Sequence, residues 1–117
     1  MMRLSPLIAA SAALLGGCQH TPVETPAVLT DASDANISAL KSALSEALGR
    51  SRVELGAGDP TVEPQVAILP PPLGTREDRS PAMPSLFNLL MRDGICIAVE
   101  ADTRAETVLT GVTCRAL

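Results

Sequence analysis

Cysteine is the residue type of this chain with the widest chemistry, because a thiol can carry a lipid, form a disulfide, bind a metal or act as a nucleophile. The 117 residues include three cysteines, Cys18, Cys96 and Cys114, and a single histidine, His20. Cys18 lies close to the start of the chain, whereas the other two lie near its end. The residues around each cysteine indicate which chemistry it favours.

The residues before Cys18 have the form of an export signal. Arg3 is the only charged residue among the first 17, and residues 4–15 (LSPLIAASAALL) form a short apolar run. A basic start followed by such a run is typical of a secretory signal peptide. A membrane-spanning helix needs about 20 apolar residues, so the run is too short to span a bilayer comfortably. Residues 1–17 are therefore predicted to be a signal peptide.

The signal ends in Leu15-Gly16-Gly17-Cys18, which resembles the lipobox of bacterial lipoproteins. The resemblance implies cleavage before Cys18, a diacylglycerol on its thiol, and a fatty acyl chain such as palmitate on its amino group. Two or more chains anchor a protein stably, because each buried CH₂ contributes about 0.8 kcal/mol. Gln19 stands where Asp retains Gram-negative lipoproteins in the inner membrane, which favours the periplasmic face of the outer membrane. The alternative is an ordinary cleaved signal followed by a chance cysteine.

Cys96 and Cys114 are the two cysteines that remain in the exported chain. An even pair in an oxidising compartment predicts a disulfide, here closing a loop of 19 residues counted inclusively. A loop of that size stabilises a small domain by about 3 kcal/mol in the chain-entropy model. A redox or metal pair is the alternative, but the sequence has no CxxC motif and its one histidine, His20, follows Cys18 closely.

The sequence offers no convincing catalytic constellation. A nucleophile needs a base to activate it, and His20 lies only two residues after the predicted anchor. Lys41 is the only lysine, so a Ser–Lys dyad remains a formal alternative. The carboxylates show no spacing that marks an acid–base pair or a Ca²⁺ loop. We therefore expect no enzyme activity, cofactor or metal site. The acidic residues considered for a catalytic pair or a Ca²⁺ site are Glu54, Asp59, Glu63, Glu77 and Asp78.

Composition narrows the classes of partner. The chain has 9 basic and 13 acidic residues, and loss of Arg3 with the signal leaves 8 and 13, a net charge of −5. Nucleic acid and anionic lipid both attract Lys and Arg clusters, so neither is an expected electrostatic partner. The sequence has no Trp or Tyr and one Phe, Phe87, which argues against aromatic stacking on sugars or single strands. No small-molecule ligand is evident.

Residues 18–32 contain two prolines and no periodicity, so they are predicted to be a flexible tether. Residues 33–48 then carry an apolar stripe at three- and four-residue spacing, which predicts an amphipathic helix. Ser33 or Asp34 suits its N-cap, and Gly49 its end. The stripe packs on the domain's own core or, alternatively, on a partner helix. The domain is expected to occupy residues 33–117.

Short strands are predicted over residues 52–55, 65–69, 86–92, 95–100 and 107–114. Asp93-Gly94 between two apolar runs is a strong hairpin signal. A short helix over residues 85–92, capped by Ser85, is the alternative. A second hairpin would place Cys96 opposite Cys114, Ala98 opposite Val112 and Glu100 opposite Thr110; alternatively, the disulfide joins strand ends.

The proline-rich segment 68–85 is the expected contact surface. Pro70, Pro71 and Pro72 exclude a helix and favour polyproline II, a conformation that partner proteins recognise. The mixed charges at 76–79 suit a solvated loop tip. The alternative is a stiff surface crossing with no partner. The residues predicted to touch a partner are Pro70, Pro71, Pro72, Leu73, Arg76 and Arg79.

The part of the chain from Ala47 to Cys114 resembles small proteobacterial envelope lipoproteins to which no activity is assigned. The resemblance covers about two-thirds of the mature chain and supports treating it as one unit. The residues that carry it are Ala47-Leu48-Gly49-Arg50, Val53-Glu54-Leu55, Leu69-Pro70-Pro71-Pro72-Leu73-Gly74, Glu77-Asp78-Arg79-Ser80, Phe87 and Gly111-Val112-Thr113-Cys114.

The predicted fold is α+β, with one amphipathic helix on a small antiparallel sheet of three to five strands and one disulfide. The expected function is a lipid-anchored cell-envelope protein that acts as a non-catalytic binding, adaptor or structural module. Its expected partners are the membrane, through the anchor, and an envelope protein. A small inhibitor of a periplasmic enzyme, or less favourably a small hydrolase, is the alternative.

Overall fold

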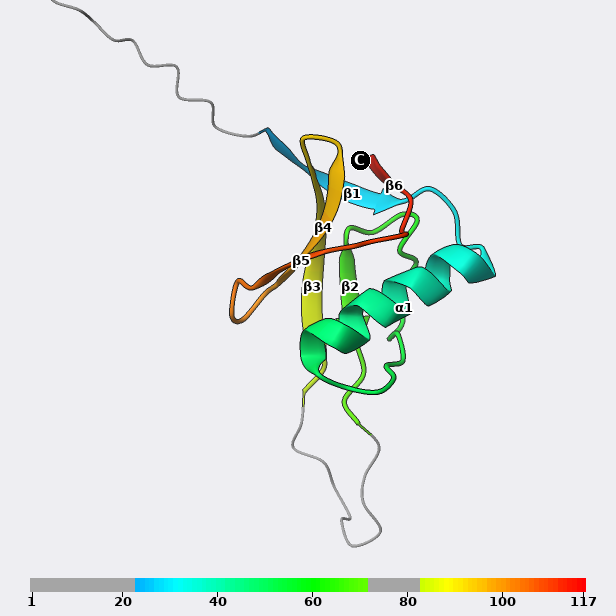
Figure 1. Ribbon diagram of the computed structural model, residues 1–117, viewed down its shortest axis with the longest axis vertical. Coiled ribbons are helices and arrows are strands. Elements are labelled where there is room, and N and C mark those ends of the chain that lie inside the picture. The colour runs from blue at the N-terminus through cyan, green and yellow to red at the C-terminus, as the bar shows by residue number, and fades with distance from the viewer. Residues whose placement is uncertain (1–22, 72–82) are drawn as a thin grey trace, which may run out of the picture.

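An antiparallel sheet of six strands with one helix packed against it forms the part of the chain that the computed structural model describes, residues 23–71 and 83–117 (Figure 1). The predicted α+β class is confirmed. The elements are β1 (Glu24–Leu29), α1 (Asp34–Leu48), β2 (Gln65–Ile68), β3 (Ser85–Arg92), β4 (Ile95–Glu100), β5 (Glu106–Val108) and β6 (Cys114–Ala116).

Helix α1 begins and ends where local sequence signals place it. The Ser33 hydroxyl accepts a hydrogen bond from the backbone N–H of Asn36, and Gly49 ends the helix with φ 67°, a left-handed conformation that glycine adopts without strain. The side chains of Leu40 and Leu44 are fully buried in the core. The predicted helix is confirmed, and its apolar stripe packs on the domain's own core.

The β3–β4 hairpin is the longest ladder of the sheet, and its turn explains why. Asp93 and Gly94 both have positive φ, 53° and 80°, which is the signature of a type I′ turn. Such a turn matches the twist of the two strands, so Arg92 pairs directly with Ile95. The predicted hairpin is confirmed, and the alternative helix over 85–92 is wrong.

Strand β1 corrects the predicted tether of residues 18–32. Its first half pairs with β3 and its second half with β6, and residues Ala27–Leu29 have no exposed surface. The prolines suggested a spacer, but Pro26 lies where the β1–β3 ladder ends, so its missing N–H interrupts no continuing ladder. The folded unit therefore starts by Glu24 rather than at residue 33, and the sheet gains a strand.

The predicted strand over residues 107–114 is also wrong. β5 ends at Val108, and the chain then turns through Gly111, which has φ 80°, before β6 begins at Cys114. Ala98 pairs with Thr107 rather than with Val112, and Glu100 lies beyond the β4–β5 ladder. The turn at Gly111 sends the chain away from β4 and towards β1, so β6 pairs with β1 instead.

Of the two other predicted strands, the one over residues 65–69 is confirmed and the one over residues 52–55 is not. β2 confirms the short strand near residues 65–69 and pairs with the first half of β3. Residues 52–55 form no strand, although Leu55 makes an isolated bridge to Ile68. Within the proline-rich segment 68–85, residues 72–82 lie outside the described residues. Pro72, Leu73, Arg76 and Arg79 are therefore not described, and neither is Cys18.

The sheet is strongly rolled. Its strand order is β5-β4-β3-β1-β6, so a flat sheet would hold β4 and β6 three strand spacings apart, about 14 Å. The Cα atoms of Cys96 on β4 and Cys114 on β6 are only 6.1 Å apart. Cys96 belongs to the hydrophobic core, and Cys114 packs against it. The roll therefore closes the sheet over its own core, and Figure 1 shows β1 crossing beside the β3–β4 hairpin.

Removal of β1 tests whether this segment is part of the folded unit. A chain that begins at Thr30 loses three fully buried residues, and truncating one buried Leu alone costs about 2–5 kcal/mol, comparable with the roughly 5–15 kcal/mol that stabilise a whole domain. We expect no cooperative thermal unfolding in circular dichroism. A matched chain that begins at Val23 should unfold cooperatively, and equal melting of the two chains would contradict the structure.

Candidate functional site

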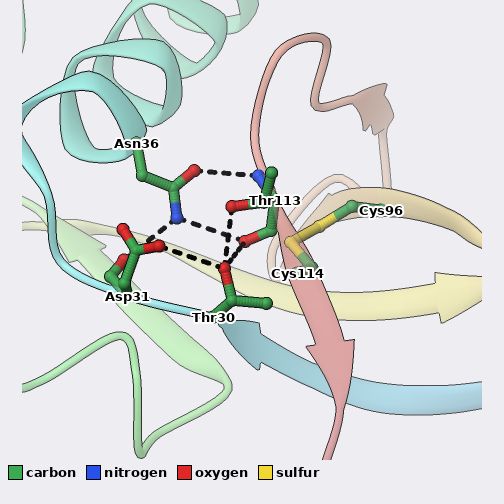
Figure 2. The surroundings of a disulfide bond; sticks show 6 residues. All are labelled: Thr30, Asp31, Asn36, Cys96, Thr113 and Cys114. Carbon is green, nitrogen blue, oxygen red and sulfur yellow. Dashed lines mark hydrogen bonds between the residues drawn. A yellow bond between two sulfur atoms is a disulfide. The ribbon is translucent and has the colours of Figure 1, made fainter.

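The Cys96–Cys114 disulfide is a buried cross-link between two strands that share no ladder. Figure 2 shows the sulfur–sulfur bond joining β4 to β6. The Cys96 side chain is 7% exposed, and Cys114 packs against the core. The predicted disulfide is confirmed. The hairpin pairing of Cys96 with Cys114 is wrong, and the bond instead joins residues near the ends of two strands, which was the alternative. This arrangement favours a structural role, because Cys96 is buried and Cys114 is partly buried.

A polar cluster beside the disulfide holds the start of α1 against the segment that leads into β6. The Asn36 Nδ2 donates to the backbone oxygens of Asp31, at 2.9 Å, and Thr113, at 3.2 Å, and the Thr113 N–H donates to Asn36 Oδ1 at 2.8 Å. Figure 2 shows these contacts together with the 2.8 Å bond between the hydroxyls of Thr30 and Thr113.

The cluster is satisfied from within. Asn36 is 5% exposed, yet its amide oxygen and nitrogen both have partners, as buried polar groups require. The Asp31 carboxylate accepts the backbone N–H of Ser33, and hydrogen bonds from Ser33 hold the Asp31 pKa below its ordinary value. These groups therefore fix the chain's conformation and leave no polar atom of Asn36 aimed at a ligand.

Of the candidate catalytic residues, Glu77 and Asp78 lie outside the described residues, and Lys41 and Glu54 are the two that form an ion pair. The Lys41 ammonium faces the Glu54 carboxylate at 3.6 Å. The Asp59 carboxylate accepts hydrogen bonds from the N–H and hydroxyl of Thr61, which lower its pKa. Within residues 23–71 and 83–117 no three His, Cys, Asp or Glu side chains gather as a metal site would need. In the same ranges no helix has the length and apolar character needed to cross a membrane.

The proline segment enters a groove that the sequence did not reveal. Leu69, Pro70 and Pro71 form one wall, and residues 50–54 form the other, around an open volume of about 810 Å³. The walls are held together by the Leu69 N–H, which donates to the Glu54 carbonyl at 2.9 Å. The lining combines apolar surface with charged ends, a composition suited to an extended peptide.

Positive charge concentrates along the 50–54 wall. The Arg50 guanidinium donates to the Leu69 carbonyl at 2.8 Å, and Arg52 pairs with Glu54 at 3.1 Å while its side chain stays 83% exposed. Hydrogen bonding from Arg52, with the charge of Lys41, lowers the Glu54 pKa. Lys41 and Arg52 thus share the Glu54 carboxylate, while the Arg50 guanidinium binds a backbone carbonyl, in a chain whose net charge is negative. The Arg50-Ser51-Arg52 pattern directly after the helix was the signal that sequence analysis missed.

A second charged cluster joins three strands on the face of the sheet that points away from α1. Arg92 on β3 donates to Glu24 on β1 at 2.7 Å, and makes two bonds of 2.8 Å to the carboxylate of Glu106 on β5. Hydrogen bonding from Arg92 lowers the Glu106 pKa, and the two carboxylates raise the Arg92 pKa. The strand register places Ile97 of β4 between Arg92 and Glu106, and Ile97 is only 5% exposed.

Comparisons with models of protein families, with curated proteins and with solved structures found no match. No ligand, reaction or partner is therefore transferred to this chain from a relative. The groove is the candidate functional site.

Replacement of Asn36 tests the structural role of the polar cluster. Asn36→Ala removes three hydrogen bonds that join Asp31, α1 and Thr113, so we expect the free energy of unfolding to fall by about 2–3 kcal/mol in chemical denaturation. The matched control is Asn88→Ala, an exposed strand amide bonded to Gln65, which should change stability by no more than about 0.5 kcal/mol. Equal effects of the two variants would contradict the assignment.

Proposed function

We propose that this chain is a lipid-anchored protein of the cell envelope that acts as a non-catalytic binding or adaptor module. The observation that carries the proposal is the Leu15-Gly16-Gly17-Cys18 sequence, which ends only six residues before β1 begins. A buried disulfide supports the same compartment, since such bonds persist in oxidising surroundings. Gln19 favours the periplasmic face of the outer membrane over the inner membrane.

The groove supports a protein as the partner. The wall formed by residues 50–54 includes Val53, which is buried, and the two arginines Arg50 and Arg52. Backbone from two chain segments forms the walls, so an extended segment of a partner fits better than a compact ligand. We propose that this segment is acidic, because the exposed Arg52 guanidinium gives the groove a positive end. Pro70 and Pro71 contribute rigid apolar surface that loses little entropy on binding.

The lipid anchor has a direct test in metabolic labelling. Cells that express the full chain are grown with labelled palmitate, and the label is expected in the wild-type protein and absent from Cys18→Ser. Intact mass of the purified protein should agree with loss of residues 1–17 and addition of acyl chains. Cys96→Ser with Cys114→Ser is the matched control, because these two thiols form the disulfide and should leave labelling unchanged. Equal labelling of wild type and Cys18→Ser would disprove the anchor.

The groove is tested by site-specific photo-crosslinking in intact envelope. A photoreactive amino acid at Ser51, which lines the groove, is expected to trap a protein adduct that is lost in Arg52→Glu, because the reversed charge repels an acidic segment. Arg115→Glu makes the same charge change at an exposed site on β6 and should leave the adduct unchanged. Survival of the adduct in Arg52→Glu would show that Arg52 is not part of the binding surface.

A further inference from the structure

We propose that the end of the sheet where β1 begins rests on the bilayer, and that the groove lies at the opposite end, away from the membrane. The inference depends on the proposed lipid anchor at Cys18 and adds to it an orientation of the folded domain. It follows from three observations on the structure: the position of β1, the reach of the chain that precedes it, and the apolar side chains exposed at that end.

The strand register defines the two ends of the molecule. Glu24, the first residue of β1, pairs with Arg92, so β1 begins beside the turn that joins β3 to β4. Ser85, at the other end of β3, pairs with Ile68, and the chain from Ile68 leads directly into Leu69 and the groove. Figure 1 shows β1 starting next to the β3–β4 turn, with the end of β2 at the far end of the sheet.

The covalent reach of the chain disfavours the inverted orientation. Six residue steps separate Cys18 from Glu24, and a fully extended chain covers at most about 20–22 Å in six steps. Seven steps along β3 separate the level of Glu24 from that of Ser85, or about 23 Å. With the groove end on the bilayer, the chain from Cys18 to Glu24 would have to be fully extended along the whole length of β3. The short tether therefore favours the β1 end facing the membrane.

Exposed apolar side chains allow the β1 end to contact the bilayer; Leu69 and Leu86 are also exposed at the groove end, so the short tether decides between the two ends. Val23 is 73% exposed, and Ile95, which pairs with Arg92, is 49% exposed. Leu117, whose N–H donates to the Pro26 carbonyl, is 63% exposed. The Arg92 guanidinium offsets the charge of Glu24 at this end, where the side chain of Asp93 is also exposed. Apolar groups at a bilayer interface gain free energy by leaving water, so this end suits the headgroup region.

The test measures the distance of two labelled sites from the lipid headgroups. Ile95→Cys places a thiol at the β1 end, and Asp102→Cys places one in the turn after β4, at the far end; both sites are exposed. Each lipidated protein, labelled with the same fluorophore, is reconstituted into phosphatidylcholine vesicles that contain a headgroup spin label. We expect several-fold stronger quenching at residue 95 than at residue 102. Non-reducing mass must show that the Cys96–Cys114 bond is retained.

Flotation of the vesicles separates failure of the orientation from failure of the anchor. A protein that floats with the vesicles and shows equal quenching at the two sites lies on its side, which overturns the proposed orientation. Stronger quenching at residue 102 overturns it as well. A protein that does not float lacks the anchor, so the proposed function and the orientation both fail.

Discussion

One strand that belongs to two ladders determines the architecture of this protein. β1 pairs with β3 through Glu24–Pro26 and with β6 through Ala27–Leu29, so its two halves serve different neighbours. Because β6 follows β5 by only a few residues, this double pairing forces the sheet to roll until its two ends approach each other. The core of α1, β2 and β3 lies inside the roll. Without β1 in place, β6 has no ladder and the polar cluster at Thr113 loses its support.

The disulfide and the Asn36 cluster reinforce that roll from two sides. Cys96–Cys114 fixes β6 to β4, and the Asn36 amide pairs with the backbone of Thr113, one residue before Cys114. The cross-link acts on the unfolded chain by restricting a loop, which contributes about 3 kcal/mol in the chain-entropy model, whereas the amide acts on the native state. A domain of this size has little apolar surface to bury, so these two contributions form a large share of its stability.

Features with local causes were predictable from the sequence, and those that depend on distant partners were not. The helix cap, the helix end at Gly49 and the turn at Asp93-Gly94 are each encoded within a few residues. The cap is Ser33, one of the two residues that the sequence offered, and the other two features were found as predicted. β1 has two prolines in and before it and no alternating pattern, so only its two partner strands make it a strand. The same holds for the candidate site. Pro70 and Pro71 were predicted from local composition, but residues 50–54 face them only because the bridge between Leu55 and Ile68 brings the two segments together.

The early start of β1 changes what the proposed anchor can do. A tether that ran to residue 32 would let the domain explore a wide volume above the bilayer, whereas five residues between Cys18 and Glu24 hold it within about 20 Å of the surface. Confinement of that kind raises the effective concentration of partners in the same membrane and lowers that of partners elsewhere, because a linker that cannot span two sites gives no gain. In the proposed orientation, with the groove at the far end of β3, a partner would present its acidic segment some tens of ångströms above the bilayer, roughly the sum of tether and strand lengths. The geometry thus favours a partner that itself stands on or rises from the membrane over a small protein that diffuses freely.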